Sequence, residues 1–525
     1  MNFIEKLKGV FRRMFSSESL KQTINLQPIL SAPMKDAIEL WEMMYKDESP
    51  WLYEDNNLKS LGLASMIASA KARTATIEME LKVTGDGERR DFIDDFLKTK
   101  IEHSIRKQLE YGIALGGIVF KPYVYKVGNK YKVGMNYVKA TDFYPLAFNS
   151  EGDVTDAAFI DRIITKDNIY SKVERYHLID TTLYVSNMAF KQSNKDSSIA
   201  IHNISTLGEP IPLSSVPEWS NIDSEAVIND TDNIMFAYFK MPQANTIDLN
   251  SPLGVSGFSK ATDLIKHADE LYSNLLWEFE GGQLAVDVDR TAVNPLLDNN
   301  GNMANLLPHL QDRLFRRNLD LGDEAAYNVF SPQLRDESII NGLNNVLMHI
   351  EDICDLGRGE LSMVTYQEAR TATELKILKQ RSYSANWDVQ KELEKALRKT
   401  VDIVDKYCDL YNITPSGKFE VAYKWDDSIL VDAEAERNSD VIDITNGLMS
   451  RVEYRMKWFG ETKDQAMQSV KEIDEEKLTQ MEQQQEMFAQ FSEKPDTQEG
   501  SPNNKDGSAD KSNKDTTQYT KTKSD

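Results

Sequence analysis

One uninterrupted helical segment constrains this chain more than any other feature of its sequence. Thr371-Ala372-Thr373-Glu374 has the spacing of a capping box, in which the threonine and glutamate side chains satisfy free backbone N–H groups, so a helix should begin there. Neither proline nor glycine interrupts the chain from that point until Pro415. A helix of about 40 residues spans about 60 Å, which suits the backbone of an elongated subunit better than a compact enzyme core.

Two more helices are predicted in the middle of the chain, on either side of a mixed segment. The first has a broad apolar stripe between Ser259 and Gly281 and ends at Gly281-Gly282. The mixed segment contains a predicted strand at Leu284–Val288. The second helix is predicted to end at Gly357-Arg358-Gly359. Its stripe consists of Ile339, Ile340, Leu343, Val346, Leu347, Ile350 and Ile353.

The first half of the chain combines helical and strand patterns. Residues Trp41–Thr99 predict helices, with a packed helix at the small and apolar residues Leu61–Ala72. Gly85-Asp86-Gly87 is interpreted as a turn rather than as a phosphate cradle between a strand and a helix. From Gly117 to Val138 the apolar residues alternate, which predicts a hairpin that turns at Gly128-Asn129.

Further strands are expected through about Phe239, so the fold class of the first half is α+β. Phe419–Trp425 also alternates and predicts a strand that returns to a sheet before Asp426-Asp427. Helices resume from about Asp432 to Phe491. After Phe491 the chain is too polar to bury a core, and disorder is expected.

The charge balance argues against a protein that grips nucleic acid over its surface. The chain has 84 acidic and 61 basic side chains, a net charge of −23, whereas DNA-binding proteins neutralise phosphates with lysine and arginine. Basic residues never run three in a row. The densest pairs are predicted to be solvated surface charge: Arg12-Arg13, Arg89-Arg90, Arg106-Lys107 and Arg316-Arg317.

No motif in the sequence predicts an enzyme or a cofactor. The chain has no Gly-x-x-x-x-Gly-Lys phosphate loop, no His-Glu-x-x-His zinc helix and no Gly-x-Ser-x-Gly nucleophile elbow. Asp94-Asp95 and Asp426-Asp427 are expected surface acids rather than cation ligands. Cys354 and Cys408 are too few for a disulfide framework, which favours synthesis in a reducing cytosol. The histidines, at 103, 177, 202, 267, 309 and 349, lack ligand spacing.

The first fifteen residues form a short basic amphipathic pattern, which fits either a membrane surface or docking onto a partner. No uncharged stretch of the chain exceeds thirteen residues, whereas a membrane-spanning helix needs about 20 apolar ones. No membrane span is therefore predicted.

Five segments in this order resemble the portal proteins of tailed double-stranded DNA phages with long non-contractile tails, of the kind that infect Gram-positive hosts. The resemblance runs from about Trp41 to Ile473. The segments are LEYGIALGGIVFKPYV (Leu109–Val124), YPLAFNSEGDVTDAAFI (Tyr144–Ile160), FAYFKMPQANTIDLNSPLGVSGFSKATDLI (Phe236–Ile265), ARTATEL (Ala369–Leu375) and WDDSILVDAEAE (Trp425–Glu436).

The resemblance implies an α+β portal fold with wing, stem, clip and crown regions and long helices around the central channel of a dodecameric ring. The implied regions are an N-terminal arm (1–40), the wing (41–258), a stem helix (259–280), the clip (281–334), a second stem helix (335–357), a tunnel loop (358–370), a long helix with the returning wing strand (371–430), crown helices (431–491) and a disordered tail (492–525).

The implied function is non-enzymatic: a channel for DNA packaging and ejection at one capsid vertex of the virion, assembled in the host cytoplasm. The implied partners are other copies of the chain, the double-stranded DNA in the channel, the large terminase subunit, head–tail adaptor proteins, and a capsid, scaffold or minor head protein. In the tunnel loop, Arg358, Gln367 and Arg370 are the candidate DNA-facing residues. Relatives often have a Ser-Pro-Gly-like turn where this chain has Leu356-Gly357-Arg358-Gly359, which leaves the shape of the loop open.

Two alternative interpretations of the sequence remain open beside that of a portal protein. One is a different structural component of a phage head–tail junction, with the same layout but no DNA conduit. The other is a nucleic-acid-processing enzyme with a diffuse acidic metal site, for which Asp426 and Asp427 are the candidate ligands.

Overall fold

The computed structural model describes Leu20 and residues 28–55, 57–193, 207–282, 285–289, 315–318, 327–330, 333–363, 372–425 and 433–492. The chain is mixed α and β, with 48% helix and 24% strand. It divides into two units, Met1–Asp432 and Ala433–Asp525. The predicted basic N-terminal helix, the pair Asp426-Asp427 and, apart from Ser492, the predicted disordered tail (492–525) lie outside the described residues.

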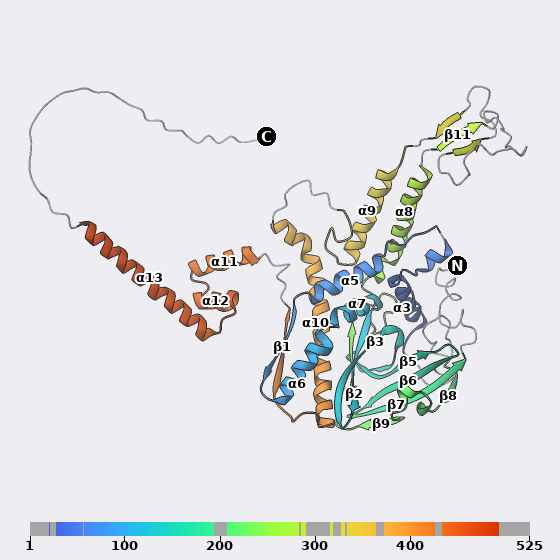
Figure 1. The fold of residues 1–525 in the computed structure, drawn as a ribbon, viewed down its shortest axis with the longest axis horizontal. Coiled ribbons are helices and arrows are strands. Elements are labelled where there is room, and N and C mark those ends of the chain that lie inside the picture. The colour runs from blue at the N-terminus through green and yellow to red at the C-terminus, as the bar shows by residue number, and fades with distance from the viewer. Residues whose placement is uncertain are drawn as a thin grey trace, which may run out of the picture. The chain divides into compact units, whose positions relative to one another are not determined.

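Figure 1 shows the elements of the first unit. Its helices are α3 (Ala32–Tyr45), α4 (Pro50–Glu54), α5 (Leu63–Thr76), α6 (Glu88–Phe96), α7 (Ile105–Leu115), α8 (Thr262–Gly281), α9 (Asp336–Ile353) and α10 (Ala372–Leu410). Its strands are β1 (Met79–Gly85), β2 (Gly117–Val127), β3 (Lys130–Lys139), β4 (Phe143–Phe148), β5 (Val154–Ile164), β6 (Asn168–Ile179), β7 (Thr182–Ser193), β8 (Glu209–Ile211), β9 (Glu225–Ile228), β10 (Ala237–Lys240), β11 (Ala285–Asp289), β12 (Phe315–Asn318), β13 (Tyr327–Phe330) and β14 (Phe419–Trp425).

The strands that the structure describes form four sheets. The largest has the order β4-β5-β6-β7-β8, with β9 also paired to β7, and a second sheet has the order β10-β2-β3. The predicted hairpin is confirmed as β2 and β3, which pair antiparallel from Ile118↔Lys139 to Val127↔Lys130. Gly128 at its turn has φ +61°, a backbone angle that glycine adopts without steric cost.

The long helix predicted from the capping box is confirmed as α10, which has 39 residues and spans about 58 Å. Its position beside the sheet follows from a buried apolar stripe that contacts α5, β2 and β10. The stripe includes Val389, Leu393, Ala396, Leu397 and Val404. Its predicted N-cap, Thr371, lies outside the described residues.

Small residues let α5 pack closely against neighbouring helices. Ala64, Ala68, Ala72 and Ala75 are all buried, and α5 contacts α7 and α10 along this face. The predicted packed helix at Leu61–Ala72 is therefore confirmed, shifted toward the C-terminus.

The prediction of continuous helices from Trp41 to Thr99 is wrong at β1. This strand pairs antiparallel with β14 over its whole length, from Met79↔Trp425 to Gly85↔Phe419. Gly85-Asp86-Gly87 is a turn, as interpreted from sequence, but it does link a strand to a helix, which that interpretation had excluded. A Cβ at Gly85 would lie 2.6 Å from the carbonyl oxygen of Lys418, so the glycine is needed for close strand approach.

The prediction that Arg89-Arg90 is solvated surface charge is wrong for Arg89, which is 2% exposed. Its guanidinium forms ion pairs with Asp405 and Asp409 near the end of α10. It also donates to the hydroxyl of Thr414 at 2.8 Å and to its carbonyl oxygen at 3.0 Å. A buried arginine with all these partners fastens α6 to the end of α10.

The segment predicted as an excursion between two helices contains a small sheet with the order β12-β11-β13. Its strand β11 confirms the strand predicted at Leu284–Val288. The flanking helices α8 and α9 lie side by side (Figure 1). At their junction, Arg335 donates to the carboxylate of Glu278 through its backbone N–H at 3.0 Å and through its guanidinium at 3.2 and 2.7 Å.

The second unit consists of the helices α11 (Ala433–Thr445), α12 (Arg451–Phe459) and α13 (Lys463–Ser492), as the sequence predicts. A capping box of Ser450 and Glu453 begins α12, and Gly460 ends it with φ +66°. Asp440 of α11 accepts from Lys457 at 2.6 Å and from the Trp458 indole at 2.7 Å, which ties α11 to α12.

Among the helices that the structure describes, none combines the length and the apolar character needed to cross a membrane.

Candidate functional site

The end of α9 and the first residues of the predicted tunnel loop form a densely hydrogen-bonded polar cluster. The helix α9 ends at Ile353 and not at Gly357 as predicted from sequence. Asp355 has φ +54°, and the N–H of Leu356 donates to the carbonyl of Glu351 at 2.9 Å. This is a Schellman ending, usually made by glycine, and here an aspartate takes the left-handed position.

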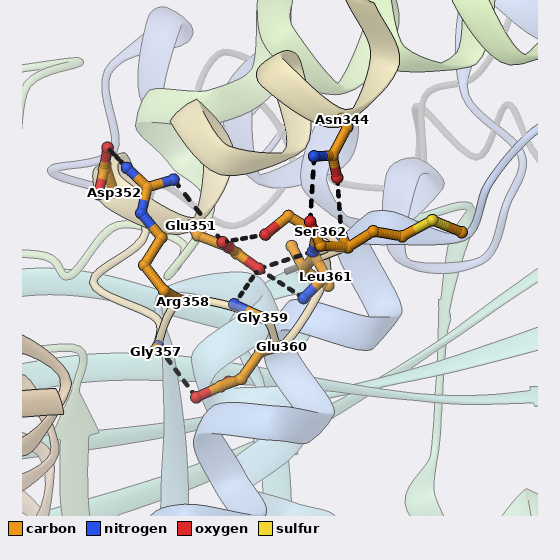
Figure 2. Close-up of polar contacts among 10 residues, drawn as sticks. Asn344, Glu351, Asp352, Gly357, Arg358, Gly359, Glu360, Leu361 and Ser362 are labelled. Atoms are coloured by element: carbon orange, nitrogen blue, oxygen red, sulfur yellow. Dashed lines mark hydrogen bonds and ion pairs between the residues drawn. The ribbon is translucent and has the colours of Figure 1, made fainter. Parts of the chain in front are cut away.

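The carboxylate of Glu351 lies at the centre of the turn formed by residues 357–363, called here the Glu351 turn (Figure 2). Glu351 is fully buried. Its Oε1 accepts from the backbone N–H groups of Gly359 at 3.2 Å, Leu361 at 2.7 Å and Ser362 at 2.7 Å. Its Oε2 accepts from the Ser362 hydroxyl at 2.8 Å. One carboxylate therefore satisfies several turn donors at once.

A second side chain of α9 holds the far end of the same turn. The amide of Asn344 donates to the carbonyl of Met363 at 3.1 Å and accepts from its N–H at 2.6 Å. Asn344 lies two helical turns before Glu351, so both side chains project from one face of α9. Neither residue was predicted from the sequence, although a polar pair at this spacing beside the apolar stripe is a visible signal.

Arg358 is the one predicted site residue that the structure describes. Its guanidinium is ion-paired to Asp352, and its NH1 lies 3.8 Å from the Glu351 carboxylate (Figure 2). The Arg358 side chain remains 32% exposed. Both carboxylates come from α9, so Arg358 contributes to holding the turn against that helix. Gln367 and Arg370 lie outside the described residues, and the approach of all three to DNA stays a prediction.

Beneath the turn lies a small pocket bordered by α5 and α10. Its lining includes Lys71, Asp355, Glu360 and Asn386. Burial lowers the pKa of Lys71, while Cys354, Asp355 and Glu360 act in the opposite direction. Burial also raises the pKa of the Cys354 thiol to about 12, so this cysteine is an unreactive thiol at neutral pH.

The chemistry of the Glu351 turn is that of a structural anchor. Its buried carboxylate oxygens are occupied by donors of the turn itself. Within the described ranges, no cluster of three or more His, Cys, Asp or Glu side chains is arranged to hold a metal ion. The arrangement can fix the start of the following loop on α9.

Comparison with models of known protein families and with curated proteins gives no match for this chain.

Proposed function

We propose that this chain is a portal subunit, twelve copies of which form a ring at one capsid vertex through which double-stranded DNA is packaged and ejected. The proposal rests on the resemblance described from sequence and on one structural observation. Two adjacent helices, α8 and α9, flank a small three-stranded unit, and a single 39-residue helix follows and returns to an α+β body.

Under this proposal each part of the chain has a role. The α+β body with the returning strand β14 is the wing, α8 and α9 are the stem, and β11–β13 belong to the clip. Residues 358–370 are the tunnel loop, and α11–α13 form the crown. The clip is the docking platform for the terminase and later for the head–tail adaptors, while the chain itself remains a non-enzymatic virion component.

The surface of α8 supports assembly into a ring. Leu276, Trp277 and Phe279 are 36%, 64% and 45% exposed near the end of this helix. Exposed large apolar side chains in one region favour contact with another protein. A closed ring needs a head-to-tail interface, in which two different surfaces of each subunit meet.

The acidic character of the chain supports a conduit. Counterion-releasing contacts to phosphates would slow a sliding duplex, whereas a net charge of −23 keeps attraction weak. The Glu351 turn would fix the start of the tunnel loop on α9, so that the loop follows any movement of the stem. Gating in this mechanism is passive, and a separate ATPase drives the DNA.

Negative-stain electron microscopy of the purified full chain tests the proposal. Rings with a central hole are expected, together with an absence of ATP hydrolysis that scales with protein concentration. A chain that stays monomeric in solution and in assembled particles would overturn the portal assignment, and intrinsic ATPase activity would overturn passive gating.

A further inference from the structure

The β2–β3 hairpin has a charge opposite to that of the rest of the chain. Residues 117–139 contain Lys121, Lys126, Lys130, Lys132 and Lys139 and no acidic residue, in a chain whose net charge is −23. The same segment carries four tyrosines, at 123, 125, 131 and 137. Tyrosine is enriched in contact surfaces, because it buries a large area at low entropic cost.

The strand register sorts these side chains onto two faces. Directly opposed residues of an antiparallel pair lie on the same face, and Tyr125 opposes Lys132 while Val127 opposes Lys130. Tyr123 lies on this face too, with its ring over Gly134. We call Tyr123, Tyr125, Val127, Lys130 and Lys132 the hairpin outer face. Its apolar members are 43%, 38% and 50% exposed, and both lysines are exposed.

The opposite face of the hairpin already contacts the body of the subunit. The ring of Tyr131 lies 5.0 Å from that of Tyr411, just beyond the end of α10, and Lys126 lies 5.6 Å from the Tyr131 ring centre. The hairpin is thus supported from behind. Among the described strands, β3 pairs with β2 alone, so its outer edge is open to another chain.

The outer face continues into a polar cavity of about 210 Å³ at the base of the hairpin. Lys121, on the same face of β2, and Lys172 of β6 both line it and share one carboxylate, with Nζ atoms 2.9 and 3.3 Å from Glu174 Oε2. Lys121 is 5% exposed and Lys172 is 9% exposed. Asp142 and Asp161 also line the cavity, and Asp142 lies 3.7 Å from Arg162. Because each ammonium group has three N–H donors and the two share one carboxylate oxygen, a further acceptor can still bind beside them.

We propose that the hairpin outer face docks onto an acidic surface of a second copy of this chain, with a carboxylate of that copy reaching the cavity beside Lys121 and Lys172. The inference rests on the proposed ring. A head-to-tail interface joins two unlike surfaces, and a basic hairpin is complementary to acidic surface on a neighbouring copy of a chain whose net charge is −23. Duplex DNA is disfavoured as the occupant because the net charge of the chain repels it at long range.

The test compares two charge-matched variants of the full chain by sedimentation velocity and negative-stain imaging. Lys130→Glu/Lys132→Glu reverses the outer face, and Lys82→Glu/Lys166→Glu makes the same change at exposed lysines on β1 and in the β5–β6 turn. We expect the first variant to assemble at least about tenfold more weakly than wild type, and the second to assemble normally. Tyr125→Ser should also weaken assembly, independently of charge. Circular dichroism confirms that each variant is folded.

Four outcomes decide the inference. Selective loss of assembly in the outer-face variants, with wild-type assembly weakening as salt rises, supports it. Normal rings from every variant overturn it and leave the portal proposal standing. Wild-type chain that never assembles overturns both. In the fourth outcome, the wild type binds a fluorescent DNA duplex, and Lys130→Glu/Lys132→Glu loses this binding while its assembly is unchanged. This result would assign the hairpin outer face to nucleic acid and overturn the inference.

Discussion

At the scale of single residues, Glu351 and Glu174 are both buried carboxylates, but they have different structural roles. Glu351 accepts mainly from backbone N–H groups and fixes a turn, whereas Glu174 lies between two ammonium groups and the hydroxyl of Tyr176, which donates to it at 2.9 Å. Buried carboxylates are tolerated only when such partners replace water. Removing either one therefore leaves its partners unsatisfied.

Glu351→Ala should lower the free energy of unfolding by about 3 kcal/mol, because several buried donors lose their acceptor together. Glu351→Gln should cost less, since one carbonyl oxygen remains. Urea unfolding measures both. Asp352→Ala is the control, because Asp352 is 39% exposed, and it should cost less than about 1 kcal/mol. Equal losses from Glu351→Ala and Asp352→Ala would contradict the anchoring role.

Glu174 predicts a pH dependence. Burial alone would raise its pKa, but Lys121 and Lys172 reverse the effect and hold the pKa at about 2. Because this folded-state pKa is below the unfolded value of about 4.3, the ionised group stabilises the fold above about pH 4.3, and this contribution disappears as the pH falls toward 2.

Glu174→Gln should therefore cost on the order of 3 kcal/mol at pH 7. The difference from wild type should shrink between about pH 4.3 and pH 2, as measured by urea unfolding at a series of pH values. A difference that stays constant over that range would show that Glu174 titrates normally.

At the scale of elements, two features stabilise the C-terminal end of α10: the partners of Arg89 and a left-handed residue after the helix. Arg89 joins α6 to the last turns of α10 and to Thr414. The helix then finishes with a second Schellman ending, in which Asn412 has φ +48° and the N–H of Ile413 donates to the carbonyl of Cys408 at 3.0 Å. Asn412, and not Pro415, is thus the residue that turns the chain out of the helix.

Arg89→Ala should lower the free energy of unfolding by about 3 kcal/mol or more, because Asp405 and Asp409 lose their buried cation. Arg89→Lys should recover part of this loss but not all, since one ammonium cannot reproduce the planar set of donors. The neighbouring Arg90→Ala should change stability little, because Arg90 is 34% exposed. Thermal unfolding of the three variants checks the ranking, and similar values for Arg89→Ala and Arg90→Ala would refute it.

Asn412→Ala should destabilise the chain by about 1 kcal/mol relative to Asn412→Gly, because alanine disfavours a positive φ. Chemical denaturation of the pair measures this difference directly. Asn412 is exposed, so the comparison changes backbone preference with little change in packing. If Asn412→Ala proves as stable as Asn412→Gly, the positive φ at residue 412 does not determine the stability of this helix ending.

At the scale of the whole molecule, the portal proposal predicts that Arg358 and Arg370 meet DNA in the channel. Arg358→Ala/Arg370→Ala should reduce the DNA packaged per particle while rings still assemble. Arg358 also pairs with Asp352, so Asp352→Asn is the matched control that breaks this ion pair but keeps the cation. Normal packaging by the double variant would show that neither arginine contacts DNA in the channel. Equal packaging defects in the double variant and the control would show that Arg358 acts only by stabilising the Glu351 turn.

Several elements of this protein could be predicted because they depend on residues that are close together in the chain. Apolar periodicity located α8 and α9, a capping-box spacing followed by a stretch without helix breakers located α10, and the glycine-containing turn located the β2–β3 hairpin. Helices and hairpins of this kind are specified by residues three, four or a few positions apart. The same local signals failed for the end of α9, because an aspartate took the left-handed position that glycine was expected to fill.

Features that depend on partners far away in the chain could not be predicted from local patterns. The strand β1 exists because β14 pairs with it from the far end of the first unit, and Arg89 is buried because Asp405, Asp409 and Thr414 surround it. The role of Glu351 likewise depends on a turn whose N–H groups fold back over α9. Local sequence patterns carry no information about these long-range contacts. The free energy that stabilises them comes from burial, and from protein groups replacing water as hydrogen-bond partners, once the chain has folded.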